Sequence, residues 1–228
     1  MVRDATLLIV PGYKGSGPDH WQSWLEQQVP GATRVVGIDW NAPILAQWAG
    51  RVRDTLARTT QPIRVVAHSF GCLAAVVAAA DRPECVADLV LVAPADPARF
   101  DFVGLRPESS HAKPLSLCDA LPLRDLGVNG CLVASRNDTW LEFGKARELA
   151  GAWGLGFHDA GAKGHINEEA GFGAWPEFVQ LLAQRGVPRH DRPRAAVLGK
   201  GRGSALAAVR QLTRAQIDAR TFHADDQR

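Results

Sequence analysis

The sequence lacks any apolar run of the roughly 18 residues that a helix needs to cross a bilayer. The stretch from Thr6 to Val10 is apolar, but it is too short for the core of a signal peptide and follows Arg3 and Asp4 too closely. We therefore expect a cytoplasmic protein that does not bind a membrane.

Cysteine is also scarce, and the few cysteines are far apart. No two of them lie two residues apart, and none has a histidine nearby at the spacing of metal ligands; they are Cys72, Cys85, Cys118 and Cys131. The glycine-rich stretch from Pro11 to Gly17 contains a lysine, but the lysine and the following hydroxyl are not in the order of a phosphate-binding loop. We expect reduced thiols, no metal and no cofactor.

What the sequence contains is typical of one globular domain followed by a charged extension. The 228 residues are 46% hydrophobic and 22% charged. From Arg185 onward there are ten basic and four acidic residues, against sixteen and twenty in the first 184. We predict a main domain over residues 1–184 and a basic, loosely docked extension over 185–228, with a short helix from Ser204 to Ala219.

Apolar runs of strand length alternate with stretches of helical spacing. The predicted strands are Thr6 to Val10, Arg34 to Ile38, Ile63 to Ala67, Leu89 to Ala93, Cys131 to Ala134 and Gly156 to His158. The predicted helices are Trp21 to Val29, Ile44 to Leu56, Cys72 to Ala80, Ala146 to Trp153 and Trp175 to Leu182. This alternation predicts an α/β fold of about six mostly parallel strands with helices on both faces.

One long excursion, from Ala98 to Leu126, interrupts the alternation. It contains three prolines and several polar residues, so it is either a substrate lid or an inert connection. A lid at this place would narrow the entrance to a site and restrict the size of its substrate.

The strongest chemical signal is the segment Ala67-His68-Ser69-Phe70-Gly71, which lies between a buried strand and an alanine-rich helix. A nucleophile elbow holds a serine on such a turn, and the residues two before and two after it must be small. Ala67 and Gly71 satisfy this requirement, although alanine replaces the usual first glycine. The alternative is an ordinary strand-to-helix turn with a capping serine.

A serine nucleophile needs a histidine as general base and an acid that orients the histidine. Asp138 follows the strand that ends near Ala134, and His165 follows the last strand, which gives the order serine, acid, histidine. Both then lie at the carboxyl edge of the sheet, where ligands bind in open α/β folds. Asp96, after the fourth strand, is the alternative acid.

The oxyanion of a tetrahedral intermediate needs two backbone donors. We expect one from Phe70, directly after the serine, and one from Tyr13 in the loop after the first strand.

Other histidines and the tryptophans receive structural interpretations. His68 is expected to point away from the reacting hydroxyl, His158 to pack within a strand, and His20 to belong to a capping segment, Asp19-His20-Trp21, that could instead shape the pocket. The remaining histidines, His111, His190 and His223, lie in the excursion or the extension. Tryptophans expected in the core or the pocket lining are Trp40, Trp48, Trp140, Trp153 and Trp175.

Taken together, these segments resemble a family. Ser16-Gly17-Pro18-Asp19-His20-Trp21, His68-Ser69-Phe70-Gly71, Asn137-Asp138 and Gly164-His165-Ile166-Asn167-Glu168 resemble the small serine hydrolases related to retinoblastoma-binding protein 9 and the bacterial YdeN proteins. The resemblance covers about residues 5–184. It implies a compact, cofactor-free α/β hydrolase with a triad of Ser69, Asp138 and His165, and it does not specify a substrate.

The leading hypothesis is hydrolysis of a small carboxylic ester, or an amide or thioester, through an acyl-enzyme on Ser69. The alternative is a protein-interaction module that keeps the fold and uses its surface or basic extension. No Leu-Xaa-Cys-Xaa-Glu stretch, which would support a retinoblastoma-type contact, occurs in the chain. Acidic residues are interspersed in the extension and Phe222 is its single aromatic residue, so we expect no binding of nucleic acid.

Overall fold

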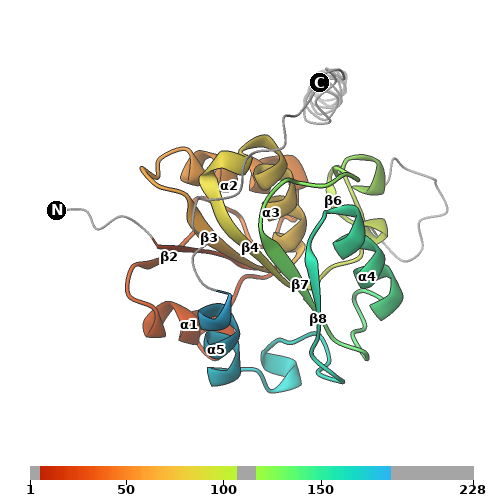
Figure 1. The fold of residues 1–228 in the computed structure, drawn as a ribbon. Helices are drawn as coiled ribbons and strands as arrows, with labels where there is room; N and C mark the ends of the chain where they lie inside the picture. The colour runs from red at the N-terminus through yellow and green to blue at the C-terminus, as the bar shows by residue number, and fades with distance from the viewer. Residues whose placement is uncertain (1–5, 107–116, 186–228) are drawn as a thin grey trace, which may run out of the picture.

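Six parallel strands form the central sheet of the computed structural model, which describes residues 6–106 and 117–185 (Figure 1). The strand order is β2-β1-β3-β4-β7-β8, and every neighbouring pair in this sheet is parallel. The strands are β1 (Leu7–Val10), β2 (Ala32–Arg34), β3 (Ile63–Ser69), β4 (Val86–Pro94), β7 (Gly130–Ala134) and β8 (Gly156–Asp159). This arrangement confirms the predicted α/β class.

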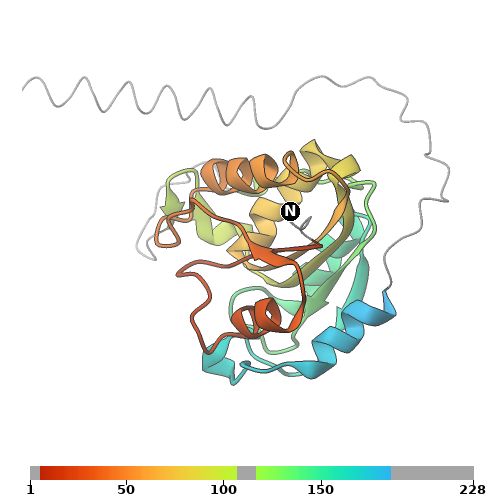
Figure 2. The same cartoon turned by 90° about the vertical axis from the view of Figure 1, so that its left-hand side faces the viewer.

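Helices cover both faces of the sheet, as Figure 2 shows. One apolar cluster packs beneath α1 (Trp21–Gln28) and α5 (Pro176–Gln184). The other packs beneath α2 (Leu45–Leu56), α3 (Phe70–Asp81) and α4 (Phe143–Ala152). Because β1, β3, β4 and β7 have apolar residues on both faces, the sheet is buried from both sides.

Helix α3 is the most deeply buried helix among the described residues. Its residues from Phe70 to Ala79 are all buried, which fits its composition of alanine, valine, leucine, cysteine and glycine. A helix that is apolar all round must be covered on several sides. The sheet lies on one side of α3 and α2 on another, so the turn between β3 and α3 is fixed at the centre of the domain.

The prediction for the second strand was wrong in its position. The sequence predicted a strand from Arg34 to Ile38, whereas β2 spans Ala32–Arg34. Val35 still donates its amide to the carbonyl of Ile9, but Val36 is 74% exposed and Gly37 has a φ of 74°. The glycine turns the chain away from the sheet edge, so the apolar run that follows is not a strand.

The excursion after β4 is anchored in the core at the two ends that the structure describes. It contains the antiparallel hairpin of β5 (Phe100–Asp101) and β6 (Gly104–Leu105), and Phe100 and Leu117 are fully buried. Residues 107–116 lie outside the described part, so the choice between a lid and an inert connection stays open.

The domain ends, within the described residues, on a buried ion pair. Asp88 is 1% exposed and accepts hydrogen bonds from Arg64 and from Arg185, whose Nη2 lies 2.7 Å from Oδ1. The predicted extension from Arg185 therefore contacts the domain at its first residue. The rest of the extension, with the helix predicted from Ser204 to Ala219, lies outside the described residues.

Two further features bear on expectations from the sequence. Over residues 6–106 and 117–185, no helix is long and apolar enough to cross a membrane. No disulfide joins the cysteines, and burial raises the pKa of the Cys131 thiol to about 11.

Candidate active site

Ser69 lies on a strained turn between β3 and α3. Its φ of 53° and ψ of −127° are unfavourable for a residue with a side chain, and such strain is found where function demands it. Small neighbours make the turn possible. A Cβ on Gly71 would collide with the carbonyl oxygen of Pro11, and a Cβ on Gly12 would lie 2.7 Å from Cβ of Ser69. The predicted elbow geometry is therefore present in the structure.

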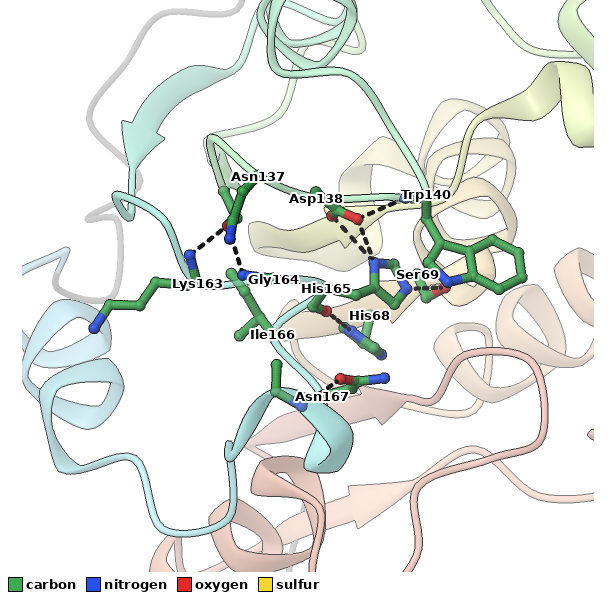
Figure 3. Close-up of polar contacts among 12 residues, drawn as sticks. His68, Ser69, Asn137, Asp138, Trp140, Lys163, Gly164, His165, Ile166 and Asn167 are labelled. Carbon is green, nitrogen blue, oxygen red and sulfur yellow. Dashed lines mark hydrogen bonds and ion pairs between the residues drawn. The ribbon is translucent and has the colours of Figure 1, made fainter.

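The structure brings Ser69, His165 and Asp138 into one hydrogen-bonded chain (Figure 3). Nε2 of His165 lies 2.8 Å from Oγ of Ser69. Nδ1 of His165 lies 2.9 Å and 3.1 Å from the two carboxylate oxygens of Asp138. The side chains of His165 and Asp138 are 9% and 3% exposed, so the pair is largely shielded from water.

The alternative acid, Asp96, takes a different place. Its carboxylate accepts the amide of Ala98, which caps a short helix, and forms an ion pair of 3.0 Å with Lys145. It has no hydrogen bond to His165 among those of the described residues. The structure therefore places Asp138 beside the histidine.

Asp138 and His165 are carried by loops that hold each other through two polar side chains. Oδ1 of Asn137 accepts hydrogen bonds from the Ser135 hydroxyl, at 2.9 Å, and from the Gly164 amide, at 2.7 Å. The Ser135 hydroxyl in turn accepts the amide of Lys163 at 2.8 Å. The sequence analysis assigned no role to Ser135 or Asn137, although both lie within the segment that contains Asp138.

Of the two predicted oxyanion donors, Phe70 directly follows Ser69, and Tyr13 directly follows Gly12, which approaches Ser69 closely. Phe70 is the first residue of α3, where backbone amides have no acceptor within the helix. Tyr13 lies in the loop after β1, which is fixed by hydrogen bonds from the Lys14 amide to Trp40 and from the Gly15 amide to Gly12. The close approach of Gly12 to Ser69 brings this loop to the nucleophile.

One of the five tryptophans that the sequence analysis assigned to the core or the pocket lining contacts the catalytic histidine candidate. Trp140 stacks on the His165 imidazole with a centroid distance of 5.5 Å and an interplanar angle of 30°. The Arg99 guanidinium also lies against the Trp140 ring, 4.8 Å from its centroid. Trp48 and Trp153 are buried in the core, Trp40 packs against Trp48, and Trp175 packs against Trp21 and Phe178.

Two other histidines are buried close to His165. His68 contacts both His165 and His20, with ring centroids 4.9 Å apart in each case. Burial, aided by the positive charge that His165 and His20 can carry, lowers the pKa of His68 well below its usual value. His20 is the N-cap of α1, since its Nδ1 accepts the amide of Gln22, and burial lowers its pKa to about 4.

The remaining histidines lie elsewhere. His158 lies in β8, as predicted, but it is exposed rather than packed, because β8 is an edge strand. The others, His111, His190 and His223, lie outside the described residues. Among residues 6–106 and 117–185, no three histidine, cysteine or acidic side chains gather as ligands for a metal ion.

Comparisons with known proteins identify similar sequences and folds. A YdeN-like hydrolase from Pectobacterium atrosepticum is 35% identical, with a TM-score of 0.68 over 80% of this chain and 90% of the other. The ydeN gene product of Bacillus subtilis is 18% identical, with a TM-score of 0.60 over 79% and 98% of the two chains. Est1E from Butyrivibrio proteoclasticus, solved with ferulic acid, is 12% identical, with a TM-score of 0.59 over 81% and 90%.

The last two similarities, at low identity, concern the fold alone. A search of curated proteins finds no match. The profile described as "Serine hydrolase" matches residues 7–184, which include the whole central sheet and the site around Ser69. The chain therefore belongs to the serine hydrolase family.

Proposed function

We propose that the protein cleaves a small carboxylic ester through an acyl-enzyme on Ser69, with His165 as general base and Asp138 as the orienting acid. The observation that carries the proposal is the continuous chain from the Ser69 hydroxyl through both ring nitrogens of His165 to the Asp138 carboxylate. An amide or a thioester would be cleaved by the same acyl transfer.

The carboxylate fixes the tautomer of the histidine. An ionised Asp138 can only accept hydrogen bonds, so Nδ1 of His165 carries the proton and Nε2 is left as the acceptor. The Asp138 carboxylate is itself oriented by the Trp140 amide, at 2.8 Å. His165 is thus prepared to take a proton from Ser69.

The reaction proceeds in two balanced steps. Oγ of Ser69 attacks the ester carbonyl carbon while Nε2 of His165 takes its proton, and the imidazolium then protonates the departing alkoxide. Water attacks the acyl-enzyme with the same base assistance, which releases the acid and restores Ser69. In both tetrahedral intermediates the oxyanion accepts from the amides of Phe70 and Tyr13, each donor contributing about 3 to 4 kcal/mol to transition-state stabilisation.

The test is covalent labelling followed by turnover. Wild-type protein, treated with a fluorescent fluorophosphonate, should carry the adduct on Ser69 by peptide mass spectrometry, and Ser69→Ala should carry none. His165→Ala should abolish labelling, whereas the matched control His158→Ala, at an exposed position on β8, should label as wild type does. No labelling of folded wild-type protein, or undiminished ester turnover by Ser69→Ala, would refute the proposal.

Unlabelled wild-type protein would then be assayed with p-nitrophenyl esters of increasing acyl length. We expect the short acyl chains to be cleaved best. Preferential turnover of long-chain esters would contradict that expectation without affecting the assignment of Ser69.

A further inference from the structure

Three consecutive residues around His165 each have one backbone group bound by a side chain from a different part of the fold, and Figure 3 shows two of these contacts, those of Gly164 and His165. The Gly164 amide donates to Asn137, which follows β7. The His165 carbonyl lies 3.0 Å from Nε2 of His68, on β3. The Ile166 carbonyl accepts the indole N–H of Trp21, on α1, at 2.8 Å.

These contacts hold a backbone that would not adopt its conformation alone. Gly164 and Ile166 have φ values of 57° and 49°, so His165 lies between two left-handed residues. Such a conformation is unfavourable for the β-branched Ile166 and persists only where its surroundings impose it. Without side-chain donors on the His165 and Ile166 carbonyls, the loop would relax toward other conformations and move the imidazole.

The donor on the His165 carbonyl is an imidazole with a proton on Nε2, and burial, which lowers the pKa of His68 well below its usual value, keeps this ring neutral. A carbonyl oxygen only accepts, so Nε2 of His68 carries the proton in this contact. The ring is 4% exposed and lies between the rings of His20 and His165. A neutral donor here holds the loop without placing a positive charge beside His165, which must itself become cationic during acyl transfer.

Strand β3 positions this donor by its alternation. Successive strand residues point to opposite faces, so His68 lies on the same face as Val66, which packs in the cluster beneath α1 and α5. Trp21 lies on that face, with its ring 5.9 Å from the ring of His68, and Ile166 of the His165 loop packs in the same cluster. Strand β3 therefore carries two residues of the site. Its last residue, Ser69, is the nucleophile, and the residue before it, His68, donates to the backbone carbonyl of His165.

We propose that His68, together with Trp21, is a positioning residue that holds the main chain of His165 so that its imidazole reaches Ser69. The inference rests on the proposed function, since it assigns how the base of that reaction is held. It predicts that loss of the Nε2 donor slows acylation at each intact site, while substrate binding changes little.

The test compares His68→Phe, which keeps a ring but has no donor, with His68→Gln, whose amide nitrogen can reach the position of Nε2. Active-site titration with fluorophosphonate to completion gives the concentration of competent sites, so rates are counted per folded site. We expect kcat per site to fall about 10- to 100-fold in His68→Phe with KM nearly unchanged, because small displacements of a catalytic group have effects of this size. His68→Gln should recover most of the loss, and the control His158→Phe should behave as wild type.

A second measurement uses wild-type protein and does not depend on the variants folding. Long-range ¹H–¹⁵N spectra distinguish the two neutral tautomers of histidine, and His68 should be neutral with the proton on Nε2 at pH 7. A proton on Nδ1, a cationic ring, or wild-type kcat per site in His68→Phe would overturn the inference. Gln giving no more activity than Phe would overturn it as well. Failure of wild-type protein to react with fluorophosphonate would instead refute the proposed function.

Discussion

His20 should make the stability of the fold depend on pH between 7 and 4. Its side chain is 3% exposed, and burial, followed by the charges of Arg34 and His165, lowers its pKa from 6.5 to about 4. Between these two values the unfolded chain binds a proton at this histidine and the folded protein does not. The contribution of His20 to the free energy of unfolding is therefore fully present above pH 6.5, and this contribution is lost as the pH falls toward 4.

The magnitude follows from the pKa difference. One pKa unit corresponds to about 1.4 kcal/mol, so a pKa of about 4 in place of 6.5 is worth about 3 kcal/mol in total. At pH 5 the unfolded state is almost fully protonated at this site and the folded state mostly is not, so about 2 kcal/mol is already lost. The pKa of His68 is also lowered, so this residue makes the free energy of unfolding depend on pH in the same direction.

The variant His20→Asn isolates the His20 part. Asparagine accepts the N2 amide well at an N-cap, so it can replace the hydrogen bond from Gln22 without titrating. The free energy of unfolding would be measured in urea at pH 7 and at pH 5. Between pH 7 and pH 5 it should fall by about 2 kcal/mol less in the variant than in wild type. The control His158→Asn, at an exposed site, should lose as much as wild type. Equal losses in His20→Asn and wild type would refute the reasoning.

Three further predictions concern the acid, the buried ion pair and the elbow. Asp138→Asn should lower kcat about 10⁴-fold in ester hydrolysis, because the asparagine amide would hold the wrong tautomer of His165. Asp96→Asn should retain activity. Loss of activity in Asp96→Asn but not in Asp138→Asn would make Asp96 the acid. Asp88→Ala should lower the free energy of unfolding in urea by about 3 to 5 kcal/mol, because two arginines lose a buried partner, and a loss below 1 kcal/mol would contradict this. Gly71→Ala should destabilise by at least about 1 to 3 kcal/mol, because the new methyl group meets the Pro11 carbonyl; wild-type thermal stability would show that the loop can yield.

Much of the fold could be predicted because the apolar periodicity is strong where the elements are buried. The predicted helix from Ile44 to Leu56 differs from α2 by one residue, and the strand from Ile63 is found as β3. The strand predicted from Arg34 to Ile38 failed at the sheet edge. There an apolar run can leave the sheet, and Gly37 and the exposed Val36 show that it does.

The site was predictable as far as chain order decides it. The ends of parallel strands meet at one edge, so the serine at the end of β3 and the acid and histidine in the loops after β7 and β8 converge there. The sequence analysis chose Asp138 as the acid and kept Asp96 as the alternative, because both follow such strands. The two candidates are distinguished only by the three-dimensional path of their loops. In the structure Asp96 forms an ion pair with Lys145, and Asp138 contacts His165.

The contacts that hold His165 could not be found in the same way. His68 and His165 are 97 residues apart, and Trp21 and Ile166 are 145 apart, and each contact is made to a backbone carbonyl. A carbonyl leaves no mark on the sequence, because every residue has one. The sequence analysis expected His68 to point away from the reacting hydroxyl, and it used that direction only to choose His165 over His68 as the base. In the structure, pointing away from the hydroxyl is what brings the His68 imidazole beneath the loop of the base.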